Sequence, residues 1–133
     1  MSETTPARSR IMRAIKSRDT APELLVRRLA HSMGYRFRVH RKNLPGTPDL
    51  VFPARRKAIF VHGCFWHSHD CGRGARVPKQ NRSYWKKKLA RNEERDEAAR
   101  KALTALGWKV SVLWECELRN RKRIERKLRV FLR

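Results

Sequence analysis

Three cysteines and one histidine have the residue types that could hold a single metal ion. Cys64, His69 and Cys71 lie within eight residues of one another, and Cys116 follows an apolar segment much later in the chain. Thiolate and imidazole are the ligands that zinc prefers, and four of them close a tetrahedral structural site. The sequence therefore favours zinc on these four residues, which would tie a long irregular loop to the sheet. The alternative is that Cys116 is a small buried apolar side chain at a strand end.

Carboxylates and imidazoles elsewhere suit a hydrolytic reaction. Asp49 stands before an apolar strand, where a buried charge is costly unless a cation or hydrogen bonds satisfy it, so a hard divalent metal is a natural partner. Asp96 lies on the apolar face of an expected helix and needs an inward partner. His62 and His67 follow another apolar strand in a glycine-bearing loop, where imidazole can act as a general base. A metal carboxylate with a histidine base suits phosphodiester hydrolysis.

Each of these residues also has a structural interpretation. Asp49 follows Thr47 and Pro48 and can be explained equally well as a turn residue. The histidines can be explained as surface or packing residues.

Aromatic residues near these positions could contact bases. Phe65 and Trp66 are adjacent in an irregular loop, and Trp85 begins a long predicted helix. Such side chains can stack on bases or wedge between them. The adjacent pair is hard to bury together, because neighbouring side chains point in different directions. Trp85 also opens the apolar stripe of its helix, so a core position is the alternative for it.

The charge balance of the chain predicts a polyanionic partner. Lys and Arg number 34 against 12 Asp and Glu, which gives a formal net charge of +22. Apolar residues make up 40% of the chain and alternate with the basic ones, so the basic groups are expected to form the surface of a folded protein. We expect nucleic acid as the partner. No stretch resembles a membrane span or a signal peptide, which predicts a cytoplasmic protein without a membrane role.

The length of 133 residues predicts one domain, 1–133. Its first 18 residues are expected to form a basic arm with a short amphipathic helix over 7–16, around Met12, that lies on DNA. Asp19 or Thr20 is expected to cap a second helix that ends at Gly34. The predicted buried stripe of this second helix comprises Leu25, Leu29, Ala30 and Met33.

The remaining periodicity predicts an α/β fold. Strands are expected at 35–40, 49–52, 57–61 and 108–114, a turn at 44–48, and helices at 83–106 and 118–131. The strand 57–61 is almost wholly apolar, which predicts a central position. The inward stripe of the helix 83–106 is predicted to comprise Trp85, Leu89, Asn92, Asp96, Ala99, Leu103 and Leu106. This order predicts a central mixed β-sheet flanked by helices.

Several segments together resemble a known family. They are 12–15, 18–20, 44–49, the His-Gly-Cys-Phe-Trp-His block at 62–67, 69–71, 92–96 and 113–116. In this order, over about residues 9–120, they resemble the Vsr endonucleases of very short patch mismatch repair. The resemblance implies a restriction-endonuclease-like single domain with structural zinc on Cys64, His69, Cys71 and Cys116.

The resemblance also implies roles in catalysis. Asp49 and the main-chain carbonyl of Val61 would bind Mg²⁺, while Glu23 and His62 would contact waters on the metal. His67 would be the base, supported by Asp96.

On the DNA, the resemblance implies a nick 5′ to the thymine of a T:G mismatch that arises where 5-methylcytosine has deaminated. Phe65, Trp66 and Trp85 would wedge into the duplex, the helix around Met12 would reach the opposite groove, and Asn92 would also contact DNA. The implied enzyme is a bacterial, nucleoid-associated monomer, coupled to mismatch-repair proteins and a cytosine methyltransferase.

Three departures bear on these expectations. Val61 stands where the family often has threonine, which preserves a carbonyl ligand but no hydroxyl, and Ser68 interrupts a run of histidines. The Glu-x-Lys part of the restriction-enzyme motif is absent after Asp49, which makes His67 decisive for catalysis. The alternatives are a non-catalytic zinc-stabilised DNA-binding module, a nuclease of this fold with another DNA target, and a basic RNA-binding protein.

Overall fold

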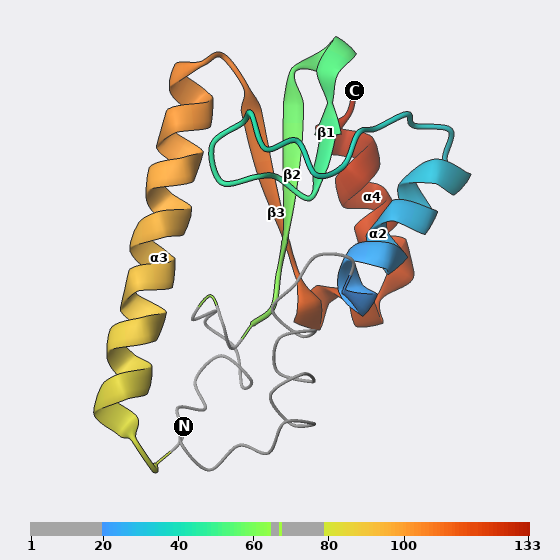
Figure 1. Ribbon diagram of the computed structural model, residues 1–133. Helices are drawn as coiled ribbons and strands as arrows, with labels where there is room; N and C mark the ends of the chain where they lie inside the picture. Colours follow the sequence, from blue (N-terminus) through green and yellow to red (C-terminus); the bar gives the residue numbers. More distant parts are fainter. Residues whose placement is uncertain (1–19, 65–66, 68–78) are drawn as a thin grey trace.

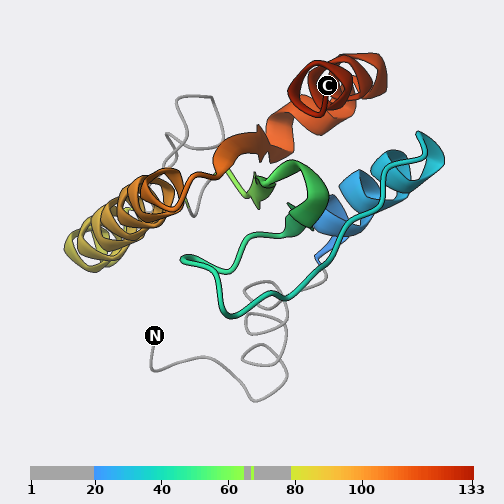
Figure 2. The ribbon, with the colours of Figure 1, turned by 90° about the horizontal axis from the view of Figure 1, so that it is seen from above.

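The computed structural model describes residues 20–64, 67 and 79–133. Its elements are α2 (Ala21–Ser32), β1 (Leu50–Phe52), the 3-10 turn η1 (Pro53–Arg55), β2 (Lys57–His62), α3 (Arg82–Ala105), β3 (Lys109–Trp114), the 3-10 turn η2 (Glu115–Arg119) and α4 (Arg121–Phe131). The strands lie between α3 on one side and α2 with α4 on the other (Figures 1 and 2). None of the described helices combines the length and apolar character needed to cross a bilayer. The expected helix 7–16 lies outside the described residues.

The sheet is mixed, with β2 in its centre, as expected. The strand order is β1-β2-β3, and β2 pairs antiparallel with β1 and parallel with β3. The expected strand 35–40 is wrong in extent, because its ladder is a single antiparallel bridge between Arg38 and Val51. The partner strand β1 is only three residues long, and His40 has a φ of 57°, which ends the extended backbone.

Alternation along β2 divides the apolar core into two clusters. Ile59 and Val61 pack with residues of α2 and α4, while Phe60 packs with Leu103 of α3. This follows from the period of two in a strand, which sends successive side chains to opposite faces of the sheet. The last two residues of β2, Val61 and His62, are therefore directed toward different helical layers.

The phase of α2 differs from the predicted one. Val26 is fully buried and Leu25 is 42% exposed, so the inward stripe is one residue later than expected at this point. The corrected spacing also brings Glu23, three residues before Val26, onto the buried face. Thr20 does cap the helix, accepting a hydrogen bond from the Glu23 N–H at 3.5 Å.

The two later helices lie where the sequence predicts them, except that α3 ends earlier and α4 begins later than expected. Along α3 the predicted stripe is buried at Trp85, Leu89 and Leu103, but Leu106 is 53% exposed because the helix has already ended at Ala105. The terminal helix begins at Arg121 and not at residue 118, because the side chain of Asn120 caps it by accepting from the Arg123 N–H at 3.1 Å.

Alanine substitutions at two leucines near the C-terminal end of α3 test how this helix packs against the sheet. Leu103→Ala should lower the free energy of unfolding by about 2–5 kcal/mol, because it removes fully buried methyl groups and leaves a cavity. Leu106→Ala, at the exposed position three residues later, should change it by less than about 0.5 kcal/mol. Urea unfolding measures both, and equal losses would contradict this placement of α3.

Candidate active site at the end of β2

Two polar clusters flank the end of β2. His62 meets His67 and Asp96 on the side of α3, whereas Val61 contacts Asp49 through its main chain, with Glu23 of α2 close by. The structure therefore brings together, in two groups, the five residues for which sequence predicted catalytic roles.

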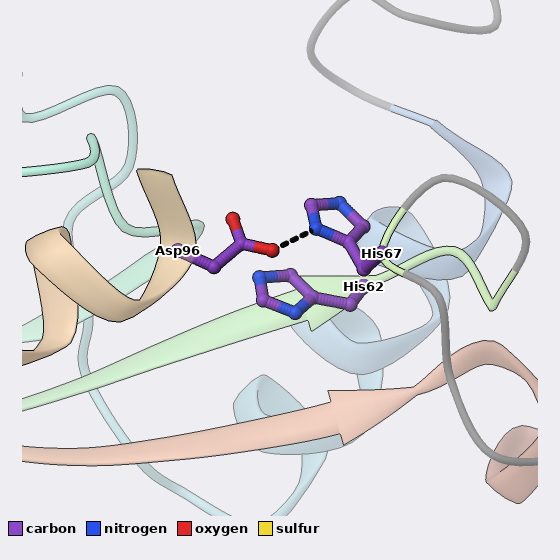
Figure 3. Close-up of side chains that lie close together, drawn as sticks. All are labelled: His62, His67 and Asp96. Carbon is purple, nitrogen blue, oxygen red and sulfur yellow. Dashed lines mark hydrogen bonds and ion pairs between the residues drawn. The ribbon is translucent and has the colours of Figure 1, made fainter. Parts of the chain in front are cut away.

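The first cluster joins a strand, a turn and a helix (Figure 3). His67 Nδ1 and Asp96 Oδ2 lie 2.5 Å apart, and the His67 N–H donates to the Gly63 carbonyl at 3.2 Å, which fixes the turn after β2. The His62 and His67 rings are stacked, with centroids 3.7 Å apart and planes 4° apart. A carboxylate can only accept, so Nδ1 of His67 carries the proton and Nε2 is left with a lone pair when the ring is neutral.

His62 is buried among aromatic rings. Its ring centroid lies 5.6 Å from Phe60 and 5.2 Å from Trp114, and its Nδ1 has no hydrogen-bond partner among the residues that the structure describes. Burial, together with the charges of His67 and Arg100, lowers the pKa of His62 to about 4, although Asp96 acts in the opposite direction. His62 is therefore a neutral imidazole near pH 7.

A hollow of about 650 Å³ between α3 and the sheet opens onto this cluster. It is lined by Phe60, His62, His67, Glu93, Glu94, Asp96, Glu97, Ala98, Arg100, Lys101, Val112 and Trp114. The side chains of His67 and Asp96 are 25% and 31% exposed, so water or a ligand can reach them.

The second cluster pairs two carboxylates. Asp49 Oδ2 accepts from the Val61 N–H at 2.6 Å, and the Asp49 N–H donates to the Ile59 carbonyl at 3.0 Å. Burial is the main reason that the pKa of Asp49 rises to about 7; the Val61 N–H opposes this rise, Glu23 adds to it, and Arg27 opposes it slightly. Two carboxylates in a partly buried site favour the proton or a cation as a third partner.

This donor set fits a hard divalent cation. Carboxylate oxygens are the ligands that Mg²⁺ prefers, and a cation would let both acids ionise together. Val61, whose carbonyl is the other predicted ligand, is joined to Asp49 by the hydrogen bond described above. Sequence reasoning missed Arg27, which pairs with Glu23 at 3.2 Å; its i, i+4 spacing on the helix was the available signal.

Two of the four predicted zinc ligands lie side by side. The Cys116 N–H donates to Cys64 Sγ at 3.4 Å, although 52 residues separate them, and Cys64 is fully buried. The contact brings together two residues of the type that zinc prefers as ligands. His69 and Cys71 lie outside the described residues, so a site with all four ligands stays a prediction.

The predicted DNA contacts are only partly described. Trp85 is buried at 7% exposure, while its neighbour Tyr84 is 50% exposed and is the more accessible ring at the start of α3. Asn92 is half-buried, four residues before Asp96 on the same face of the helix. Met12, Phe65 and Trp66 lie outside the described residues.

The raised pKa of Asp49 predicts a pH-dependent stability. Its folded value of about 7 exceeds its usual 3.8, so between these values the folded state binds more protons and stability falls as pH rises. Asp49→Asn keeps an acceptor for Val61 but no charge. In metal-free protein this variant should match wild type near about pH 4 and be more stable near about pH 8, by roughly 1–3 kcal/mol. Urea unfolding with a chelator measures this, and a difference that does not change with pH would contradict it.

Comparison with known proteins identifies the family. The sequence model described as DNA mismatch endonuclease Vsr matches residues 2–73. The type II nicking enzyme V.XorIIP of Xanthomonas oryzae pv. oryzae is 51% identical over 129 residues, covering 96% of this chain and 94% of that protein. The type II nicking enzyme V.NmeAIP of Neisseria meningitidis is 42% identical over 130 residues, 95% of this chain and 92% of that protein. DNA mismatch endonuclease Vsr of Escherichia coli K12 is 44% identical over 117 residues, 88% of this chain and 74% of that protein. The chain belongs to the Vsr family of DNA mismatch endonucleases.

Proposed function

We propose that this protein is a Mg²⁺-dependent endonuclease of very short patch repair that nicks 5′ to the thymine of a T:G mismatch left by deamination of 5-methylcytosine. Membership of the Vsr family supports the coarser part, a DNA endonuclease of mismatch repair. The observation that carries the mechanism is that the His67–Asp96 pair and the Asp49–Glu23 pair both lie beside the last two residues of β2.

In this proposal His67 is the general base. Asp96 accepts the Nδ1 proton, which orients the ring and leaves the Nε2 lone pair to take a proton from the attacking water. As His67 becomes charged, the carboxylate 2.5 Å away stabilises the imidazolium. The neutral His62 ring supports the His67 ring by stacking and adds no charge of its own near neutral pH.

Asp49, with Glu23 and the Val61 carbonyl, would hold magnesium directly or through water. When bound, the ion would polarise the scissile phosphate and stabilise the charge that develops on it. The Val61 N–H holds the Asp49 carboxylate in place, and Arg27 holds Glu23. The proposal includes a restriction-endonuclease-like fold. An acidic residue beside a strand of a mixed sheet is consistent with such a fold.

In this proposal the positive charge of the protein supplies most of its affinity for DNA, and aromatic side chains contact the bases at the mismatch. A net charge of +22 would neutralise backbone phosphates, so binding should weaken steeply with salt. Phe65 and Trp66 would wedge beside the mismatch, with Asn92 nearby and the region of Met12 in the opposite groove. Trp85, which is only 7% exposed, would have to turn out of the core to join them. We propose that the protein acts as a monomer in the bacterial cytoplasm, with mismatch-repair proteins and a cytosine methyltransferase as partners.

The names of the relatives favour a second candidate. Two of the three relatives described above are called type II nicking enzymes, which favours a nickase of this family whose target differs from a T:G mismatch. The same catalytic residues would then act in another sequence or mismatch context.

The decisive assay is strand-specific nicking of a labelled duplex with one T:G mismatch in a cytosine-methylation context, with Mg²⁺. Wild type should nick the T strand, and Asp49→Ala should be slower by about a thousandfold, because several kcal/mol of metal stabilisation are lost. A matched T:A duplex is the control. Nicking of other mismatches alone would favour the second candidate, and salt-sensitive binding without a nick would support the non-catalytic module.

The zinc assignment predicts a loss of stability on removal of one ligand. Cys116→Ala should lower the melting temperature and the soluble yield together with the bound zinc, because the metal holds residues far apart in the chain. Metal analysis and thermal unfolding of the purified protein measure both. Full zinc content with an unchanged melting temperature would contradict the assignment.

A further inference from the structure

We infer that His62, His67 and Asp96 form a second metal site, for a first-row transition ion such as Zn²⁺, Co²⁺ or Ni²⁺, and that its occupation inhibits nicking. The proposed metal binding rests only on the positions of the three side chains. The inhibitory half rests on the proposed function, because it requires His67 to be the base.

The three side chains already lie near the spacing of a metal site. One ligand atom from each, two imidazole nitrogens and a carboxylate oxygen, can be chosen so that all lie within 4.8 Å of one another. In a tetrahedral site with bonds of about 2.0–2.1 Å, ligand atoms are about 3.3 Å apart. The distances between ligand atoms must therefore shorten by at most about 1.5 Å. The stacked rings must also tilt apart, since an ion cannot lie in the planes of two parallel rings.

The ligand types select a different ion from the one proposed at Asp49. Two nitrogens and one oxygen suit zinc, cobalt or nickel, whereas Mg²⁺ prefers oxygen ligands and octahedral geometry. The Asp49–Glu23 cluster offers carboxylates instead, beside the main chain of Val61. The end of β2 would thus carry two sites of different selectivity.

The surroundings favour entry of a cation. The hollow of about 650 Å³ reaches His62, His67 and Asp96 from solvent, and Glu93 and Glu94 line the same hollow. Arg100 and Lys101 line it too, but both pair with Glu97, so Glu93 and Glu94 leave the local potential lower than the net charge of +22 alone would give. The open hollow also leaves room for water to complete the coordination sphere.

Binding at either nitrogen of His67 would remove the catalytic lone pair. An ion on Nε2 occupies that lone pair directly. An ion on Nδ1 displaces the proton shared with Asp96, and the neutral ring then carries its proton on Nε2. In both cases His67 cannot accept a proton from water.

The test is a Co²⁺ titration, followed by visible absorption, of the whole chain with its thiolate site filled with zinc and its Asp49–Glu23 site saturated with Mg²⁺. Wild type should bind one Co²⁺ with d–d bands but no sulfur-to-cobalt charge transfer. Asp96→Asn, on the half-exposed face of α3, and His62→Asn should each weaken binding by more than about tenfold. His31→Asn, an exposed histidine on α2, is the matched control and should bind as wild type. Asp49→Asn should also bind as wild type, since it belongs to the other cluster.

Each result decides one half of the inference. Absence of Co²⁺ binding, or equal binding by Asp96→Asn and wild type, would overturn the site. A nicking assay in excess Mg²⁺ then tests inhibition, and saturating Co²⁺ should slow wild type and His31→Asn alike by about tenfold or more. Normal nicking with Co²⁺ bound would overturn the inhibitory half. Co²⁺ binding in a protein that nicks no substrate would instead overturn the proposed function and leave the site standing.

Discussion

The structure depends on the alternation of side chains at the end of β2. Val61 and His62 are neighbours in the chain, yet the period of two directs them to opposite layers. The Val61 N–H fixes Asp49 at 2.6 Å, and His62 stacks on His67 at 3.7 Å. The end of one strand thus fixes Asp49 through a main-chain N–H and the imidazoles through the side chain of His62, which a loop alone could not do with the same precision.

The partly buried polar groups of the two clusters have different kinds of partner. On the α3 side a carboxylate and an imidazole satisfy each other, since Asp96 and His67 form a pair. On the α2 side two acids meet, and the pKa of Asp49 rises to about 7 because burial and Glu23 both oppose its charge. That arrangement costs stability in the metal-free fold at neutral pH, and such a cost is typical of sites that bind a cation.

Much of this arrangement could be predicted from sequence. Apolar periodicity predicted the central strand β2, the long helix α3 and the inward position of Asp96, because these patterns are long and regular. Apolar periodicity gave wrong predictions where contacts between distant segments determine the structure. The strand expected at 35–40 has only three residues of β1 beside it, and the phase of α2 depends on which of Leu25 and Val26 meets the sheet. The proximity of Cys64 and Cys116 could be predicted from ligand chemistry, and the pairing of Arg27 with Glu23 could have been predicted from their i, i+4 spacing.

The central claim is that the two clusters act on one phosphodiester. The direct measurement is a double-mutant cycle on the nicking rate at saturating substrate, with Glu23→Gln on one face and Asp96→Asn on the other. The account predicts strong non-additivity, with the double variant within about tenfold of the slower single variant, because groups that act in one step fail together. Losses that multiply fully in the double variant would show that the clusters work independently, and would contradict the account.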